Sequence, residues 1–360
     1  RFRIMSELKI NNITDRAGSS GPIIAGVSTV TSTSHMVMPS GPTEFRGGRG
    51  RAIFNGGYEI PANTSEIQTV EIATTGNATN FGNLSTARQQ GASVANSIRG
   101  ISAGGNPSQQ SVIEYILFSS SGGANDFGDL TIGRRSFAGA GNNTRGVFFG
   151  GNTPTRQSII DFITIATTGD AVEFGRIGVN AGNDSTEGGF GNDDNGGCSS
   201  PTRAFIFGSA NMTNVIQFVT ISTRGDSQDF GDLTQGNVRF PSGLSSNTRG
   251  VSGGGRQPSP LNQVNIIQSF EMTTLGNAAN FGDLTRNHEQ MASASSRTRG
   301  LFAGGYVPTS PYVAYNVIDF ITIASAGNAS DFGDLTFSGQ TNGASRGFSG
   351  CSDVNGGLID

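Results

Sequence analysis

A recurring arginine and a recurring aspartate are the residues of this chain whose spacing could support chemistry. They are Arg99, Arg145, Arg249 and Arg299, and Asp129, Asp232, Asp283 and Asp334. A ring of such residues could bind an ionic ligand through charge-assisted hydrogen bonds. A residue that returns in every copy of a motif more simply ties each copy to itself or to its neighbour, and we favour this structural interpretation. Asn83 and Arg176 replace the aspartate in two copies, where the arginine needs another partner.

A second candidate for chemistry is the segment 180–197, which is rich in Gly, Asn and Asp. Its stretch GGFGND (188–193) fits the opening of a Gly-Gly-x-Gly-x-Asp calcium repeat, in which oxygen atoms bind the ion. Such repeats need tandem copies, and Asp194 stands where an apolar residue belongs. We therefore interpret this segment as a surface loop that binds no metal.

The composition excludes several functional classes. The 360 residues contain two His, two Cys and no Trp, and 23 basic against 27 acidic residues give a net charge of −4. A mildly acidic chain without a basic run is a poor binder of nucleic acid. Apolar runs of about nine residues are too short for membrane insertion. Two histidines do not build an imidazole-rich metal or catalytic centre, so we expect no cofactor and no enzyme. A carboxylate pair of the glycosidase type stays an open alternative.

One motif organises the chain from residue 51 onward. A Phe-Gly pair recurs at intervals of 46 to 56 residues, and its phenylalanines are Phe81, Phe127, Phe174, Phe230, Phe281 and Phe332. A second motif recurs with it, as in RAIFNGG (51–57), RGISAGG (99–105) and RAFIFGS (203–209). A period near 50 residues indicates stacked modules.

Each module contains the pattern of four short strands and none of a helix. A stretch of small residues precedes the RGxFxGG strand, and an apolar strand such as IDFITIA (160–166) precedes FGDLT. Small side chains suit the innermost strand, where modules converge on an axis. The Gly-Asn and Gly-Asp pairs after the third strand predict a tight hairpin.

These motifs resemble those of kelch repeats, which place Gly-Gly at the end of the second strand and an Arg after the fourth. Gly104–Gly105, Arg88 and Arg134 match that pattern, whereas the tryptophan of the family is absent. The resemblance implies an all-β, six-bladed kelch-like β-propeller of four-stranded blades over residues 51–360. The ring closes if the strand at 346–357 pairs with 51–57. The alternative makes Arg346 the start of a seventh, truncated blade.

The two cysteines test this arrangement of blades. Cys198 and Cys351 fall in the innermost strands of blades 4 and 1, on opposite sides of the axis. That separation exceeds the reach of a disulfide bond. We therefore predict two free thiols.

Residues 1–50 do not match the module and form a separate, extended N-terminal segment. Short β-prone runs alternate there with Gly, Pro, Ser and Thr. Residues 1–4 precede Met5, and we expect them to lie outside the natural start. Its apolar residues include Leu8, Ile10, Ile13, Ile23, Ile24 and Val27. Because such a segment cannot bury these side chains by itself, we expect it to add strands to another protein. The alternative is a disordered tail.

The opening SELKINNITDRAGSSGP (6–22) and the TTGNAxxFGDLT modules resemble virion structural proteins of tailed bacteriophages, notably those of marine cyanobacteria. The resemblance implies a non-enzymatic tail, fibre or neck appendage located in the virion, with residues 5–48 docked to other virion proteins. The variable loops at 106–111, 152–158, 256–263 and 306–316 favour contact with a host surface glycan or protein. The alternative is an architectural or decorating protein with no host ligand. A homo-oligomer is a further expectation, without a heptad pattern to support it.

Overall fold

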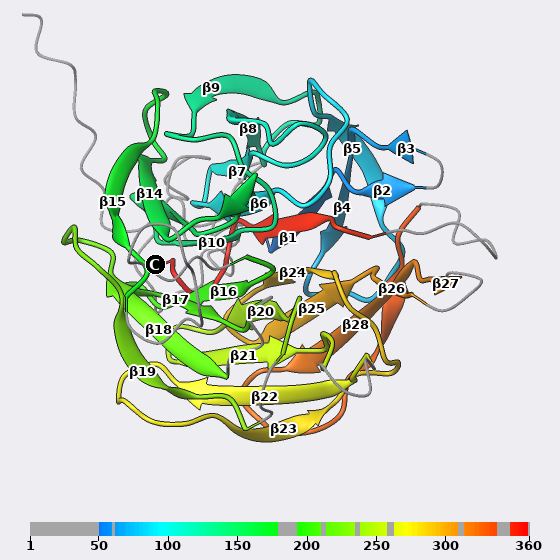
Figure 1. Cartoon of the computed structure of the whole chain (residues 1–360). Coiled ribbons are helices and arrows are strands. Elements are labelled where there is room, and N and C mark those ends of the chain that lie inside the picture. The colour runs from blue at the N-terminus through cyan, green and yellow to red at the C-terminus, as the bar shows by residue number, and fades with distance from the viewer. Residues whose placement is uncertain are drawn as a thin grey trace, which may run out of the picture. The chain divides into compact units, whose positions relative to one another are not determined.

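Six antiparallel sheets of four strands each are arranged around one axis in the computed structural model (Figure 1). The structure describes residues 50–59, 62–178, 193–209, 214–234, 238–257, 263–308, 313–336 and 346–358. Every regular element in these ranges is a β-strand. The prediction of an all-β, six-bladed propeller with four strands in each blade is confirmed.

Each blade is a meander that runs from the axis to the rim, with strands A, B, C and D in that order. Blade 1 contains β30 (Ser349–Ser352), β1 (Arg51–Asn55), β4 (Glu66–Glu71) and β5 (Thr79–Asn83); blade 2, β6 (Ala92–Ala95), β7 (Arg99–Ala103), β8 (Val112–Leu117) and β9 (Asn125–Asp129); blade 3, β10 (Ala138–Gly141), β11 (Arg145–Phe149), β14 (Ile159–Thr164) and β15 (Val172–Arg176). Blade 4 contains β16 (Gly196–Ser199), β17 (Arg203–Phe207), β18 (Val215–Thr220) and β19 (Gln228–Asp232); blade 5, β20 (Ser242–Ser245), β21 (Arg249–Gly253), β22 (Ile266–Glu271) and β23 (Ala279–Asp283); blade 6, β24 (Ala292–Ser295), β25 (Arg299–Ala303), β28 (Val317–Thr322) and β29 (Ser330–Asp334).

Three short hairpins extend the connection between strands B and C. They are β2 (Tyr58–Glu59) with β3 (Ala62–Asn63), β12 (Asn152–Thr153) with β13 (Thr155–Arg156), and β26 (Tyr306–Val307) with β27 (Val313–Ala314). Because strands A and C run in the same direction, these hairpins and the D-to-A connections lie on one face of the disc. We call it the mouth face. The A-to-B turns and the C-to-D connections lie on the opposite face, which we call the tail face.

The ring closes through the two ends of the propeller domain. Strand β30 pairs antiparallel with β1, with Phe54 opposite Gly350 and Ala52 opposite Ser352, and the red strand lies beside the blue one in Figure 1. The predicted closure is confirmed over a shorter range, because regular pairing covers Ser349–Ser352. Arg346 forms an isolated bridge with Tyr58. The seventh-blade alternative is wrong, since no B strand begins at this arginine.

Small residues form the innermost strands because the blades converge there. A Cβ added to Gly139 in β10 would lie 2.7 Å from the carbonyl oxygen of Ser93 in blade 2, closer than two such atoms approach. The two cysteines occupy this layer in β16 and β30, and both are free and buried, as predicted. Burial raises the pKa of both thiols.

The recurring phenylalanine is the extra residue of a β-bulge. Ile113 in β8 lies opposite Gly128, whereas the next residue, Glu114, lies opposite Asp126, so that Phe127 has no partner of its own. The bulge turns the phenylalanine inward, where it is 2% exposed. All six phenylalanines of the motif are buried at the equivalent position of strand D. A bulge at the same place divides the C–D pairing of every blade.

The connection between strands C and D differs from the tight hairpin that Gly-Asn predicts. Seven residues separate Glu71 from Thr79 in blade 1, and Gly76 within them donates its N–H to the carbonyl of Phe332 in blade 6 at 2.8 Å. Each of the other five blades has the same bond to its predecessor. The Gly-Asn pair therefore covers the outer edge of the neighbouring blade instead of closing a hairpin.

Candidate functional site

The recurring arginines at the start of strand B join adjacent blades on the tail face. Arg145 Nη1 donates to the carbonyl oxygens of Ile221 and Ser222 in the next blade at 2.9 and 3.0 Å. Arg99, Arg249 and Arg299 make the same pair of bonds to the next blade. Arg203 does so as well, and Arg51 donates to one such carbonyl. The arginines are thus occupied by backbone acceptors and form an inter-blade ring.

The recurring aspartates do not pair with these arginines, which corrects the pairing implied by the sequence. The side chain of Asp129 accepts a bond from Ser111 within its blade, at 2.8 Å. Its backbone N–H donates to Asp170 of the next blade, and the N–H groups of Asp232, Asp283 and Asp334 donate to asparagines in the same way. Arg176 in blade 3 makes this backbone bond too, so the position serves the blade interface without needing an aspartate.

Two buried ion pairs lie between strands C and the D-to-A connections of blades 1 to 3. Arg88 meets Glu114 at 2.6 Å, and Arg134 meets Asp161 at 2.8 Å, all four side chains being at most 2% exposed. Burial lowers the pKa of both arginines, and the facing carboxylates oppose that effect. Removing one partner of such a pair would leave a buried charge without compensation, which is strongly destabilising.

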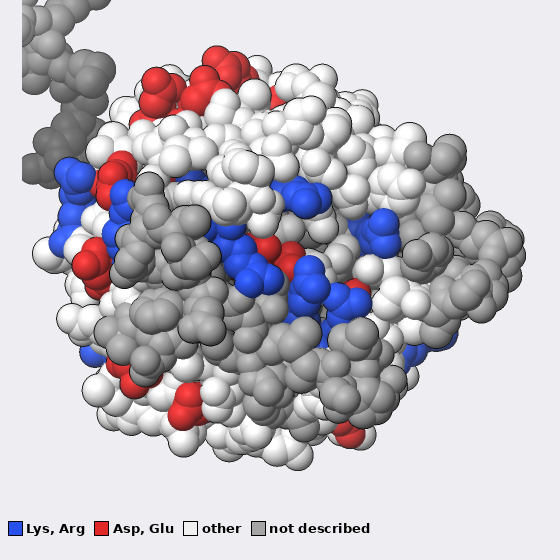
Figure 2. Space-filling model, in the orientation of Figure 1, with Lys and Arg blue, Asp and Glu red and all other residues white. Residues whose placement is uncertain are grey.

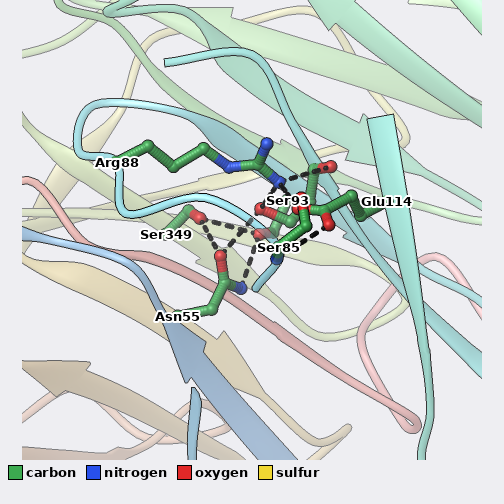
Figure 3. Close-up of polar contacts among 7 residues, drawn as sticks. Asn55, Ser85, Arg88, Ser93, Glu114 and Ser349 are labelled. Carbon is green, nitrogen blue, oxygen red and sulfur yellow. Dashed lines mark hydrogen bonds and ion pairs between the residues drawn. The ribbon is translucent and has the colours of Figure 1, made fainter. Parts of the chain in front are cut away.

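The first pair continues into a hydroxyl and amide network at the seam of blades 1 and 2. Figure 3 shows Arg88 directed toward Glu114, with Asn55, Ser93 and Ser349 beside them. Asn55 donates to Ser93 at 3.1 Å and accepts from Ser349 at 2.9 Å. The network joins both ends of the propeller domain, and Arg88 takes part in it through Nη2, whereas its Nε and Nη1 have no hydrogen-bond partner among the residues that the structure describes.

A ring of backbone hydrogen bonds surrounds the axis on the mouth face. The residue two positions before the start of each strand A has a left-handed conformation. These six residues form the mouth ring: Gln90, Ser136, Asp194, Phe240, Gln290 and Gly347. The N–H of Ser136 donates to the carbonyl of Gln90, and that of Gln90 donates to Gly347, both at 2.7 Å. Left-handed φ angles at five non-glycine residues store strain that the surrounding bonds must offset. A cavity of about 80 Å³ lies within the ring.

The side chains next to the mouth ring differ from blade to blade. The residues that precede the ring positions are Arg346, Gln89, Arg135, Asp193, Arg239 and Glu289, in the order of blades 1 to 6. Figure 2 shows basic side chains gathered with a few acidic ones toward the middle of the face in view. Here, in contrast to the tail face, equivalent positions carry different chemistry.

Several ionisable groups at the mouth have pKa values shifted by burial. Burial raises the pKa of Asp194 to about 7, and the charge of Asp193 acts in the same direction, whereas Arg239 opposes it. Burial also raises the pKa of Asp193 and of Glu289. The pKa of His288 falls to about 4, mainly through burial. His288 is therefore neutral at pH 7.

The C-terminal residues cover the other end of the axis. Leu358 is 3% exposed and its carbonyl accepts a bond from Arg297 of blade 6. Asn355 donates to the carbonyls of Ala95 and Ser352. In blades 4, 5, 6 and 1 the last residue of strand A is a serine whose hydroxyl bonds to the preceding blade. Ala95 lacks that hydroxyl, and the amide of Asn355 takes its place.

The axial channel between these two ends has a volume of about 150 Å³. It is lined by the six A strands, with glycine, alanine and serine as the main residue types. The described residues hold no cluster of three or more His, Cys, Asp and Glu side chains suited to a metal ion. Among the same residues there is no helix long and apolar enough to cross a membrane.

Part of the predicted sites lies outside the described residues. This holds for the docking residues Leu8, Ile10, Ile13, Ile23, Ile24 and Val27 and for most of the 180–197 segment. Asp193 and Asp194 at the end of that segment are described, and they pair with Arg156 and Arg239 at 2.9 and 2.6 Å.

The sequence motifs did not reveal the mouth ring or the charged positions beside it. These residues share a backbone conformation and not a residue type, so repeat comparison passes over them. A partial signal was present in the spacing, because the small-residue strand begins 11 residues after Phe81, Phe127 and Phe281. No family model and no curated protein matches the chain.

Proposed function

We propose that this chain is a non-enzymatic structural protein of a tailed-phage virion. Its N-terminal segment, residues 5–48, docks to other virion proteins, and its mouth face contacts the host surface. The resemblance of the modules and of the opening segment to phage virion proteins supports the virion role. One structural observation supports the mouth face as the binding face. The position at the start of strand B has the same residue type in every blade, whereas the position beside the mouth ring has different residue types.

This contrast suits the tail face to stabilising the fold and the mouth face to binding a partner. The tail face carries an arginine at the start of strand B in all six blades. At the mouth, the same backbone position carries arginine in three blades and glutamine, aspartate or glutamate in the other three. A fixed backbone that displays different side chains is suited to binding an asymmetric partner, because specificity resides in the loops that a rigid scaffold holds.

The position of the first described residue is consistent with docking on the side of the tail face. The described propeller begins at Gly50, whose N–H donates to Asp353 on the tail face at 3.1 Å. The described residues nearest to the docking segment therefore lie on the face opposite the mouth.

An architectural or decorating role without host contact is the second candidate. It is favoured by the charges of blades 4 to 6, which are paired within the protein and offer few free groups to a ligand. Asp193, Asp194 and Glu289 all have arginine partners.

Two measurements on the full-length chain test the proposal. Antibodies raised against the propeller should label intact particles of the virus that encodes the chain. Absence of the chain from purified particles would overturn the virion role. Fluorescently labelled protein should bind host cells and compete with infection. Incorporation into particles without any cell binding would leave the architectural role.

A further inference from the structure

We propose that the mouth face of blades 1 to 3 binds the anionic group of an acidic polysaccharide. The site consists of Arg346 and Arg135, with Gln89 and Gln90 between them around the axis. We call it the oxyanion patch. This inference rests on the proposed function for the source of the ligand, whereas the binding chemistry follows from the residues themselves.

The two halves of the mouth differ in how their charges are balanced. The carboxylates of blades 4 to 6 are paired: Asp193 with Arg156 of the blade 3 hairpin, Asp194 with Arg239, and Glu289 with Arg256, at 2.9, 2.6 and 3.2 Å. In blades 1 to 3, Arg346 and Arg135 have no carboxylate partner among the described residues. Within the described part of the chain, these two arginines therefore lie without a salt bridge on one side of the axis, in a chain whose net charge is −4.

Among the described residues, the guanidinium of Arg346 stacks on two aromatic rings and makes no side-chain hydrogen bond. Its guanidinium carbon lies 4.6 Å from the ring centre of Tyr306 and 5.1 Å from that of Tyr58. Contact through the face of the group leaves its N–H edge available, and this edge matches the two oxygens of a carboxylate or of a sulfate or phosphate ester. A side chain that is already fixed loses little entropy on binding.

Arg135 places a second donor group beyond the glutamines. It follows the buried Arg134, its backbone pairs with Asn152, and its Nε is shielded from solvent without a hydrogen-bond partner. Ser136, the next residue, bonds to Gln90 through the mouth ring. The backbone thus fixes the order Arg346, Gln89–Gln90, Arg135 around the axis.

The glutamines favour a saccharide over a free inorganic anion. Gln89 Oε1 lies 3.3 Å from the position that a Cβ on Gly347 would take, which places this amide beside the residue that follows Arg346. Amide side chains both donate and accept, as sugar hydroxyl groups require. A polymer that carries oxyanions between hydroxyl groups therefore fits arginines flanking carboxamides.

Calorimetric titration of the full-length chain with defined oligosaccharides tests the inference. Oligogalacturonate, a sulfated dextran fragment and a phosphorylated mannose oligomer present the three oxyanions, and maltohexaose is the neutral control. We expect binding of at least one acidic oligomer, weaker at higher salt, with no binding of maltohexaose. The acidic oligomer that binds best identifies the group, whereas failure of all three, or equal binding of maltohexaose, would overturn the proposal.

Matched variants locate the site. Arg346→Gln and Arg135→Gln should each weaken binding of the best acidic oligomer by about tenfold, as expected for hydrogen bonds to a charged group. Arg176→Gln removes the same charge from the rim, where Arg176 pairs with Glu173, and should leave the affinity unchanged. Unfolding midpoints equal to that of the native chain establish that the variants fold. Unchanged affinity in both patch variants would place binding elsewhere.

Failure of the oxyanion patch and failure of the proposed function give different experimental outcomes. Oligosaccharide binding that depends on Arg346 supports the oxyanion patch even if the chain is absent from virions. If both Arg346→Gln and Arg135→Gln still bind host cells as the native chain does, the proposal of host contact stands and the oxyanion patch is overturned.

Discussion

Arg299 Nη1 donates a hydrogen bond to the carbonyl oxygen of Ile72 at 3.1 Å, although 227 residues separate them in the sequence. The bond joins blade 6 to blade 1. It has the same geometry as the arginine bonds at the other interfaces, so the closing seam is held in the same way as the rest of the ring. This arginine contact is therefore one of the repeated contacts that join each blade to the next.

Substitution Arg145→Ala tests that contact. The variant loses two bonds to carbonyl oxygens in blade 4 and the stacking of the guanidinium over Phe162 at 4.9 Å. We expect the free energy of unfolding in urea to fall by about 2 kcal/mol. Arg176→Ala, which breaks an exposed pair with Glu173, should change it by less than about 0.5 kcal/mol. Equal effects of the two substitutions would contradict the inter-blade role.

The glycine of the Phe-Gly pair is a second point where neighbouring blades approach closely. A Cβ on Gly128 would lie 2.5 Å from the carbonyl oxygen of Gly169 in the next blade, and its φ is +146°. Gly128→Ala should therefore lower the free energy of unfolding by about 2 kcal/mol or more. Gly276 lies in open space with no such φ, and Gly276→Ala should leave stability unchanged or slightly higher. Chemical denaturation of both variants makes the comparison, and a tolerant Gly128 would show that the blades can separate.

The fold could be predicted because its determinants recur in sequence. Phe81 and its five equivalents keep one residue type, since the bulge turns each of them into the same kind of core. The closing strand at Cys351 could be placed because its small residues match the other A strands. The length of that strand was overestimated, because its last residues leave the sheet and cross the axis as far as Leu358.

The site could be predicted less well, for a physical reason. Arg145 was assigned a structural role from its recurrence, but its partners are backbone carbonyls, which have no sequence signature. Gln89 and Arg135 occupy equivalent positions in blades 2 and 3 but differ in residue type. What they share is the left-handed conformation of the residue that follows each of them. Arg346 meets Tyr306 from another blade, and a contact between blades is not visible in any one module.

The pH dependence of stability should carry a contribution from Asp194. Its pKa rises from the ordinary value of 3.8 to about 7 in the fold, chiefly through burial. Between these pH values the folded state holds a proton that the unfolded state has lost, so this contribution is present at pH 4 and is lost as the pH rises toward 7. We expect Asp194→Asn to remove that decline when unfolding is measured at several pH values. Parallel profiles for the variant and the native chain would contradict the assigned pKa shift.

His288 should act in the opposite direction over an overlapping range. Burial lowers its pKa from 6.5 to about 4, so at pH 5 the unfolded state binds a proton that the folded state does not. This residue therefore costs stability as the pH falls from 6.5 toward 4. The chain has one other histidine, and in His35→Gln the sole imidazole resonance belongs to His288. Its NMR titration should have a midpoint near 4, and a midpoint near 6.5 would show an exposed ring.

Removal of residues 346–360 should disrupt the whole ring and not only its last strand. The deletion takes β30 from blade 1, which leaves one edge of β1 unpaired and exposes the buried Ile53 and Phe54. An unpaired inner strand is open to pairing with other chains. We expect loss of the cooperative unfolding transition and aggregation on size-exclusion chromatography, whereas removal of residues 359–360 alone should preserve both properties. A monomeric truncated chain with the native unfolding midpoint would mean that the closing strand is dispensable, and that each blade is stable without a continuous ring.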